Sequence, residues 1–414
     1  MYLVAKHPDP VARALTLATV AASLSKGVFF SVSVLFFTKV AGFTATTVGF
    51  GLTIAGATAV GAALGAGYLA RTFGARKVLL VVTVGQSLAL ASYLVVRTPS
   101  AFVIVACAAV GQQAMQRTAL ATMIAESFTG RDRVEIRARL RVVTNVSIAA
   151  GTALAAVALA VGTRSAYLLA MLATAALLLV SALPLSRIRG TAGQVDRPER
   201  RARGRSPFLD RTYLAATCLY AVMTMQFGML TVGVPLWVAG WTKAPAVTVP
   251  ALLALNTVIV SLLQVWAARG ATTLHSAGRA VAQAGLLLAV ACGFYASAAH
   301  GVVAAMVVAL TLATVAHSFA EILSEAGGWT LAFELADPAN AGAYQGVNQT
   351  GMAIGTMLAP LVVTTTAIER GTAGWVALAA LFLITGLLTL RLVRHAVPKI
   401  GQSEPITSRV RSAN

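Results

Sequence analysis

Four ionisable side chains lie near the middle of long apolar segments of the 414-residue chain: Lys26, Arg117, His317 and Glu321. A charge at the centre of a lipid bilayer costs about 2.5–3.5 kcal/mol even on a lenient scale, so such residues face a partner or a water-filled cavity. His317, Glu321 and Glu325 follow one another at four-residue spacing, which places them on one face of a helix. Groups of this kind can bind and release a proton or hold a charged ligand.

The composition places these residues in a membrane. Hydrophobic residues make up 58% of the chain and charged residues 11%, and the mean hydropathy is +0.80. A soluble domain carries about 25% charged residues, so the sequence indicates an integral membrane protein. The net charge of +19 does not indicate nucleic-acid binding, because the basic residues fall in short clusters between apolar runs, without interleaved aromatic residues.

Twelve apolar stretches are long enough to cross a bilayer, which takes about 20 residues of helix. Six are predicted at 14–38, 47–70, 78–97, 101–126, 140–162 and 165–186. Six more are predicted at 212–240, 247–268, 280–299, 301–326, 342–367 and 374–394. The sequence therefore predicts an all-α integral membrane fold, with twelve transmembrane helices arranged as two pseudo-symmetric six-helix bundles.

The most polar stretch of the chain separates the two sets of spans and contains eight arginines. Many like charges and few apolar residues favour a solvated linker. We therefore predict an N-terminal six-helix bundle at 1–186, a cytoplasmic basic linker at 187–211, a C-terminal six-helix bundle at 212–394 and a cytoplasmic tail at 395–414.

The distribution of basic residues predicts how the chain crosses the membrane. With these spans, 25 Lys and Arg residues fall on the side of the N-terminus and 5 on the other side. Segments that remain in the cytoplasm carry an excess of Lys and Arg. The sequence thus predicts a multi-pass protein of the cell membrane with both termini in the cytoplasm.

Weak internal similarity relates the two halves. Residues 27–36 align with 228–237 at an offset of 201, and residues 151–155 align with 355–359 at an offset of 204. Two parallel six-helix halves, with a substrate site between them, are a known plan of membrane transporters. The alignment therefore favours a transporter built from a repeated unit.

Residues 67–77, which join the second and third predicted spans, resemble the signature loop of the major facilitator superfamily, roughly G-x-L-A-D-R-x-G-R-K. The residues that fit include Gly67, Gly74, Arg76 and Lys77. Arg71 stands where the family has an acid that steadies its outward-facing state, so this interaction is expected to differ here. The resemblance implies a secondary transporter that works by alternating access.

Two other stretches resemble the same superfamily. Residues 141–145, which open the fifth predicted span, resemble its R-x-x-x-N pattern. Residues 320–346 resemble the tenth-span acid and the following loop of its drug:proton antiporter branch. The resemblance thus covers the whole architecture and points to that branch.

In this superfamily spans one, four, seven and ten line the cavity, and here they carry Lys26, Arg117, Gln226, His317 and Glu321. The 204-residue offset maps Arg117 onto Glu321. A carboxylate that is alternately desolvated and paired with a cation changes its affinity for protons. We hypothesise that Glu321 takes and releases a coupling proton, with His317 as relay. Lys26 or Arg117 would be the counter-charge. The alternatives are a static Arg117–Glu321 ion pair and a packing role for His317.

Further candidates to contact the substrate are Phe30, Gln116, Gln226 and Asn256. Amide side chains in spans also form interhelical hydrogen bonds, which is the alternative for these three. Glu325 lies near the cytoplasmic end of its predicted span, and we interpret it as solvated or paired with loop arginines.

The sequence predicts a transporter and not an enzyme. It contains no phosphate-binding Gly-Lys-Ser/Thr loop and no histidines at metal-ligand spacing, so neither a metal nor another cofactor is expected. The favoured function is proton-coupled export of a small drug-like or secondary-metabolite molecule by a monomer in the lipid bilayer. The alternatives are uptake of an organic anion, for which Lys26 and Arg117 supply positive charge, and a non-transporting membrane sensor.

Overall fold

The structure is a computed structural model that describes residues 9–188 and 204–402. These residues form helices joined by turns, and no strand occurs among them. Most of the predicted linker, at 189–203, lies outside the described residues. The predicted linker, with its flanking domain boundaries, therefore stays a prediction.

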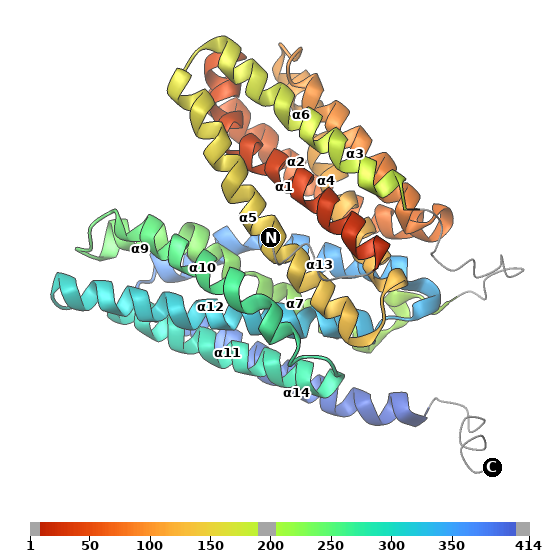
Figure 1. The fold of residues 1–414 in the computed structure, drawn as a ribbon. Helices are drawn as coiled ribbons and strands as arrows, with labels where there is room; N and C mark the ends of the chain where they lie inside the picture. The colour runs from red at the N-terminus through yellow and green to blue at the C-terminus, as the bar shows by residue number, and fades with distance from the viewer. Residues whose placement is uncertain (1–8, 189–203, 403–414) are drawn as a thin grey trace, which may run out of the picture. The chain divides into compact units, whose positions relative to one another are not determined.

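The N-terminal half consists of six long helices and one π-helical turn (Figure 1). They are α1 (Pro10–Leu35), η1 (Phe36–Val40), α2 (Ala45–Phe73), α3 (Ala75–Ser92), α4 (Pro99–Ser127), α5 (Gly130–Val161) and α6 (Arg164–Ser186). Thr44, Thr98 and Thr163 each precede a helix and accept a hydrogen bond from the backbone three residues on. Such caps satisfy amide groups that the first turn of a helix leaves unpaired.

The C-terminal half also contains six long helical segments. One of them has a π-helical turn in its interior and another ends in one. The first segment follows η2 (Pro207–Leu209) and consists of α7 (Arg211–Thr224), α8 (Gln226–Gly228), η3 (Met229–Gly233) and α9 (Val234–Trp241). The others are α10 (Thr248–Ala268), α11 (Leu274–Ser297), α12 (Val303–Glu334), α13 (Ala341–Val363), which follows η4 (Pro338–Asn340) and continues into η5 (Thr364–Ile368), and α14 (Thr372–Gln402).

Eleven helical stretches of the described residues are long and apolar enough to cross a membrane. The predicted fourth span, α4, has 29 residues and is long enough, but it is not among the eleven. Its apolar run is interrupted by Gln112, Gln113, Gln116 and Arg117. The predicted all-α membrane fold with two six-helix halves is confirmed.

Contacts between helices divide the chain into two compact units, one of Met1–Leu209 with Ala336–Met357 and one of Asp210–Leu335 with Leu358–Asn414. In the first unit, α1 packs on α5 and α6, α2 packs on α4, and α3 packs on α4 and α6 (Figure 1). In the second unit, α11 packs on α12 and α14, and α10 packs on α12. We call these the N-terminal and the C-terminal unit.

Each unit contains a crossing at which one helix touches the backbone of another through a glycine. A Cβ added at Gly27 of α1 would collide with the Ile148 carbonyl oxygen of α5, and one added at Gly151 would collide with the Leu24 carbonyl oxygen. In the C-terminal unit, a Cβ at Gly228 would lie 2.7 Å from that of Ala359 in α13. Gly27 and Gly228 occupy equivalent positions in the aligned halves, so in both units the first long helical segment crosses the fifth at this glycine.

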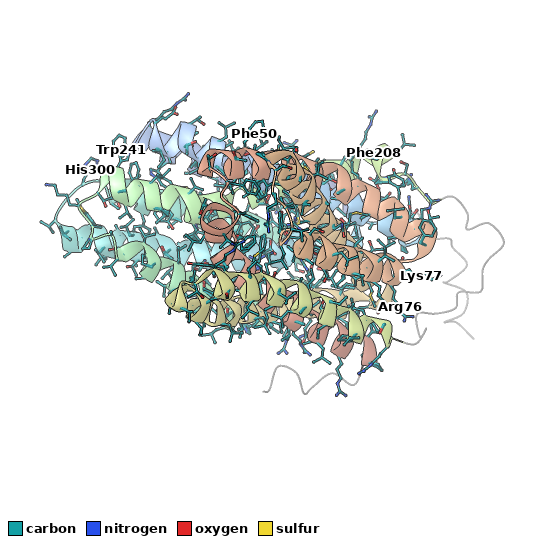
Figure 2. The ribbon with its side chains drawn as sticks, turned by 90° about the horizontal axis from the view of Figure 1, so that it is seen from above. Phe50, Arg76, Lys77, Phe208, Trp241 and His300 are labelled. Atoms are coloured by element: carbon teal, nitrogen blue, oxygen red, sulfur yellow. The ribbon has the colours of Figure 1, made fainter. Side chains whose placement is uncertain are left out.

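The turn between α2 and α3 consists of Gly74, whose φ of 87° favours glycine. The first turn of α3 carries Arg76 and Lys77, which lie together at this end of the unit (Figure 2). Arg76 donates hydrogen bonds to the carbonyl oxygens of Leu185 (3.2 Å) and Ser186 (2.7 Å) at the end of α6. This arginine of the signature loop therefore ties α3 to α6.

Substitution at the α1–α5 crossing tests its role in stability. Gly151→Ala is expected to lower the melting temperature of the protein in detergent, because overpacking costs about 1–3 kcal/mol. Gly61→Ala is the control, since an added Cβ at Gly61 meets no described atom within 4 Å and alanine favours a helix. Equal melting temperatures of the two variants would show that the crossing is loose.

Candidate functional site

The N-terminal unit contains a cavity of about 560 Å³, within the usual range of small-molecule sites. Residues of α1, α3, α4, α5 and α6 supply nearly all of its wall. The face of α1 that lines it repeats every three or four residues, which is the period of one side of a helix. This face comprises Leu15, Ala18, Thr19, Ala22, Ser23, Lys26, Phe29, Phe30 and Ser33, and Ser25 of the same helix also lines the cavity.

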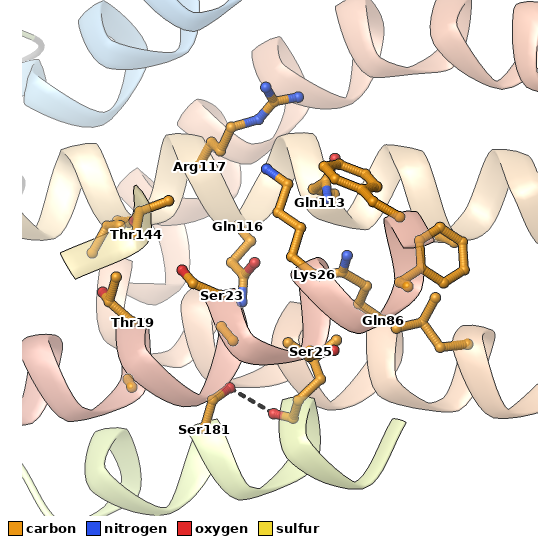
Figure 3. Close-up of a pocket in the computed structure, with 18 of the residues that line it drawn as sticks. Thr19, Ser23, Ser25, Lys26, Gln86, Gln113, Gln116, Arg117, Thr144 and Ser181 are labelled. Atoms are coloured by element: carbon orange, nitrogen blue, oxygen red, sulfur yellow. Dashed lines mark hydrogen bonds between the residues drawn. The ribbon is translucent and has the colours of Figure 1, made fainter. Parts of the chain in front are cut away.

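Four basic side chains line the cavity: Lys26 from α1, Arg117 from α4, and Arg137 and Arg141 from α5. No Asp or Glu is present among the described residues of its wall. Lys26 and Arg117 point toward the same part of the cavity (Figure 3). The charges of Arg117 and Arg141 both act on the Lys26 ammonium group. The wall therefore concentrates positive charge in one region.

Lys26 and Arg117 form no ion pair with any residue in the described ranges. The Lys26 Nζ atom lies 5.4 Å from the centre of the Phe30 ring, a distance at which the face of the ring attracts a cation. Arg137 and Arg141 also take part in other interactions of the chain. Lys26 and Arg117 are therefore the two cations whose charge is open to a ligand.

The two arginines of α5 were not expected in the cavity. The sequence predicts a fifth span that begins at residue 140, so Arg137 falls before this span and Arg141 in its first turn, whereas α5 begins at Gly130. Its first turns carry an ion pair between Glu135 and Arg139, 3.6 Å apart at four-residue spacing. Ion pairs at this spacing stabilise a helix, so the spacing of Glu135 and Arg139 in the sequence indicates that the helix begins before residue 140.

Amide side chains add hydrogen-bonding groups to the wall. Gln116 Nε2 donates to Thr83 Oγ1 at 2.9 Å, which fixes this amide between α4 and α3. Gln86 Oε1 is buried and accepts no hydrogen bond from a described residue. Gln86 and Gln113 both lie beside the Lys26 side chain in the cavity (Figure 3). One amide is thus part of the scaffold and another has an unused acceptor.

Aromatic rings form the other part of the wall. Phe29, Phe30, Phe37 and Tyr93 all line the cavity. The rings of Phe29 and Tyr93 stack at 6.2 Å, and those of Phe37 and Tyr93 lie 4.8 Å apart. Phe102 packs behind Phe37 at 4.9 Å. This aromatic wall is fixed in place by a buried cluster.

Four predicted site residues come together in the cavity, namely Lys26, Phe30, Arg117 and Gln116. The other four lie in the C-terminal unit and are Gln226, Asn256, His317 and Glu321. The hypothesis that Lys26 or Arg117 is the counter-charge of Glu321 stays a prediction. The signature-loop residues Gly67, Arg71, Gly74, Arg76 and Lys77 lie at the end of α2, in the turn and at the start of α3.

In the C-terminal unit, Asn256 of α10 donates hydrogen bonds to Glu321 Oε2 at 3.1 Å and to Ser318 Oγ at 3.0 Å. His317 is fully buried, and neither ring nitrogen has a hydrogen-bond partner among the described residues. Gln226 is also buried, and its Oε1 atom lacks a described partner. No three His, Cys, Asp or Glu side chains cluster as metal ligands in the part of the chain that the structure describes.

Glu325 is buried, whereas one interpretation of the sequence expected it to be solvated. Its side chain is 2% exposed and accepts hydrogen bonds from Tyr220 Oη at 2.9 Å and from Trp329 Nε1 at 3.3 Å. A Cβ at Gly328 would collide with the Tyr220 ring, so this glycine makes room for the tyrosine. α12 continues to Glu334 instead of ending at 326, and this places Glu325 well inside the helix.

The fold is shared with several solved transporters. The human organic anion transporter MFSD10 (TETRAN) is 17% identical, with 92% of this chain and 99% of that chain covered and a TM-score of 0.67. A bacterial homologue of the iron transporter ferroportin is 14% identical, with 93% and 98% covered and a TM-score of 0.68. The proton:xylose symporter XylE is 14% identical, with 93% and 95% covered and a TM-score of 0.65.

These identities are low, so the likeness establishes the fold and leaves the substrate open. Comparison with curated protein sequences finds no match. The sequence profile described as Major Facilitator Superfamily matches residues 15–360. Because this match covers well over half of the sequence, the chain belongs to the major facilitator superfamily.

Proposed function

We propose that this transporter carries a small organic anion by alternating access and that the cavity of the N-terminal unit binds the anionic group. The observation that carries the proposal is the set of basic side chains on that wall, without an acid among its described residues. Lys26 and Arg117 are the two expected to contact the substrate.

The cost of burying charge supports an anion. Each cation in a span costs several kcal/mol unless water or an opposite charge compensates it. The like charges around Lys26 also repel one another. An anion entering the cavity relieves both costs, whereas a cationic substrate increases them. A neutral sugar gains hydrogen bonds but leaves the charges in place.

The fold alone does not select the substrate. Solved structures of the same fold include transporters described for organic anions, iron and xylose. The choice among substrate classes therefore rests on the residues of this cavity. Their charge favours the anion, and their arrangement is the basis of the tests below.

Removal of either cation is expected to reduce transport. In liposomes containing purified protein, Lys26→Gln and Arg117→Gln should each lower counterflow of a labelled organic anion at least tenfold, because a charge-assisted contact is lost. Arg164→Gln is the matched control, since Arg164 is exposed at the start of α6 and outside the cavity. Undiminished counterflow in both cavity variants would exclude this anion site.

Export of a neutral drug-like molecule or secondary metabolite is the second candidate. The aromatic wall of Phe29, Phe30, Phe37 and Tyr93 favours it, because flat apolar compounds pack well on such rings. It predicts counterflow of neutral aromatic compounds that does not change in Lys26→Gln. A protein that shows no counterflow of either kind would fit the membrane-sensor alternative. Membership of the drug:proton antiporter branch stays a prediction.

Proton coupling is proposed for Glu321, with His317 as relay. Glu321 is buried in α12 beside Asn256, and His317 lies one helical turn before it. Ionisable side chains held inside a span are candidates for a proton pathway, and these two lie on one face of α12.

Neutralisation of Glu321 tests this coupling. Glu321→Gln is expected to abolish the response of transport to a pH gradient while counterflow continues, because exchange of substrate needs no net proton movement. Glu369→Gln is the control, since Glu369 is an exposed acid between η5 and α14. A pH-gradient response retained in Glu321→Gln would assign the proton to another group, with Glu325→Gln as the next variant.

We place both termini and the turns rich in Lys and Arg on the cytoplasmic side of the cell membrane. The excess of basic residues on that side supports this orientation. A reporter that fluoresces only in the cytoplasm should therefore be bright when fused after Asn414. A dark fusion of a protein that is still inserted would reverse the orientation.

A further inference from the structure

Charged and aromatic side chains occupy different depths of the N-terminal cavity. Consecutive helices alternate in direction, so the α4–α5 turn and the start of α1 lie at the same end of the unit. Arg117 lies ten residues before the end of α4, and Arg141 lies eleven residues after the start of α5. At 1.5 Å per residue, both are roughly 15–17 Å from that end.

The residues of α1 continue this order. Lys26 lies sixteen residues after the start of α1, and Phe30 and Phe37 lie twenty and twenty-seven residues after it. These positions correspond to roughly 24, 30 and 40 Å along the helix. The cavity wall therefore changes from cationic to aromatic along the helices of the unit, and Lys26 lies at the boundary.

The boundary is marked by a direct contact. The Phe30 ring is 56% exposed and lies 5.4 Å from Lys26 Nζ. Phe29 is next to Phe30, with ring centres 6.4 Å apart, and stacks on Tyr93. A ring that enters the cavity beside Lys26 therefore meets an existing row of aromatic surfaces.

We propose that the transported anion is an aryl carboxylate or aryl sulfonate, bound with its anionic group between Lys26 and Arg117 and its ring against the aromatic wall. This inference rests on the proposed function and specifies its substrate class. A single anionic group matches the one cationic region. The ring matches the exposed face of Phe30, because offset or edge-on contacts between rings are favourable.

The succession of a cationic region and an aromatic region disfavours two other classes of anion. A short dicarboxylate or a free phosphate would occupy only the cationic region and leave the aromatic wall without a partner. A long dianion would place its second charge among Phe29, Phe37 and Tyr93, where no cation is present among the described residues of the wall. A molecule with one charged end and one apolar end contacts both the cationic and the aromatic region.

Gln86 favours a substrate whose ring carries a hydrogen-bond donor. Its side chain is 7% exposed, and its Oε1 atom has no hydrogen-bond partner among the described residues. It lies on α3 one turn before Leu90 and two turns before Tyr93, so it borders the aromatic wall. A hydroxyl or amino group on the ring would supply the missing donor, because a buried acceptor without a donor is costly.

Binding to the full-length protein in nanodiscs of zwitterionic lipid tests the inference. The probes are 2-naphthoate, its neutral amide 2-naphthamide, and succinate as an anion without a ring, each titrated by calorimetry at one ionic strength. We expect 2-naphthoate to bind at least tenfold more tightly than either of the others. 6-Hydroxy-2-naphthoate should bind more tightly still, and Gln86→Leu should remove that gain.

Two pairs of variants separate the two regions. Phe30→Leu should weaken 2-naphthoate binding about three- to tenfold, the usual effect of losing an aromatic contact, and leave succinate unchanged. Phe50→Leu is the control, because Phe50 is also an exposed phenylalanine, in α2 and outside the cavity (Figure 2). Lys26→Gln should weaken both anions and leave 2-naphthamide unchanged, with Arg164→Gln as control. Unchanged melting temperatures confirm that each variant is folded.

The outcomes distinguish this inference from the proposed function. If succinate binds as tightly as 2-naphthoate and Phe30→Leu has no effect, while Lys26→Gln weakens both, the aryl preference is wrong and anion transport stands. If 2-naphthamide binds as tightly as 2-naphthoate and Lys26→Gln has no effect, both proposals are wrong. Failure of 2-naphthoate to bind at all also overturns the aryl preference.

Discussion

Uncompensated positive charge in a low-dielectric bundle is the constraint that shapes the N-terminal unit. Packing against apolar side chains cannot offset the desolvation of Lys26 or Arg117, so a wet or ligand-filled space must reach them. The structure provides that space and surrounds it with amide and hydroxyl groups from α1, α3, α4 and α6. Gln113, Gln116 and Arg117, three of the four polar residues that interrupt the apolar run of α4, are part of this wall. The same residues therefore make α4 a poor apolar span and the cavity a good polar site.

The wall is held in place by contacts between backbones. Gly27 is the residue after Lys26, and its close approach to α5 fixes the rotation of α1 at that point. Gly151 makes the reciprocal contact from α5, the helix that carries Arg137 and Arg141. Because side chains of fixed helices keep fixed directions, this crossing determines where the cations of two helices point. A packing feature and a binding feature are thus neighbours in the sequence.

The two halves share a helical plan and differ in their charges. The crossing at Gly228 and Ala359 joins the same two helices of the repeat as the one at Gly27 and Gly151, one turn further along the fifth helix. The acidic residues buried in α12 of the C-terminal unit are Glu321 and Glu325, and each carboxylate accepts at least one hydrogen bond from a side chain of its own unit. The N-terminal unit instead presents cations to a cavity. A repeated scaffold has therefore acquired different chemistry on equivalent helices.

The sequence by itself determined the membrane class, the helical fold and the repeat, because the length and composition of apolar runs depend only on local residue order. It also singled out Lys26 and Arg117, since a charge within such a run is conspicuous. The inclusion of Arg137 and Arg141, the burial of Glu325 and the row of rings from Phe29 to Tyr93 were decided by the tertiary structure. Those features depend on where a helix begins beyond the membrane and on which faces of distant helices meet. Neither property is encoded in a local pattern, because both arise from packing between segments far apart in the chain.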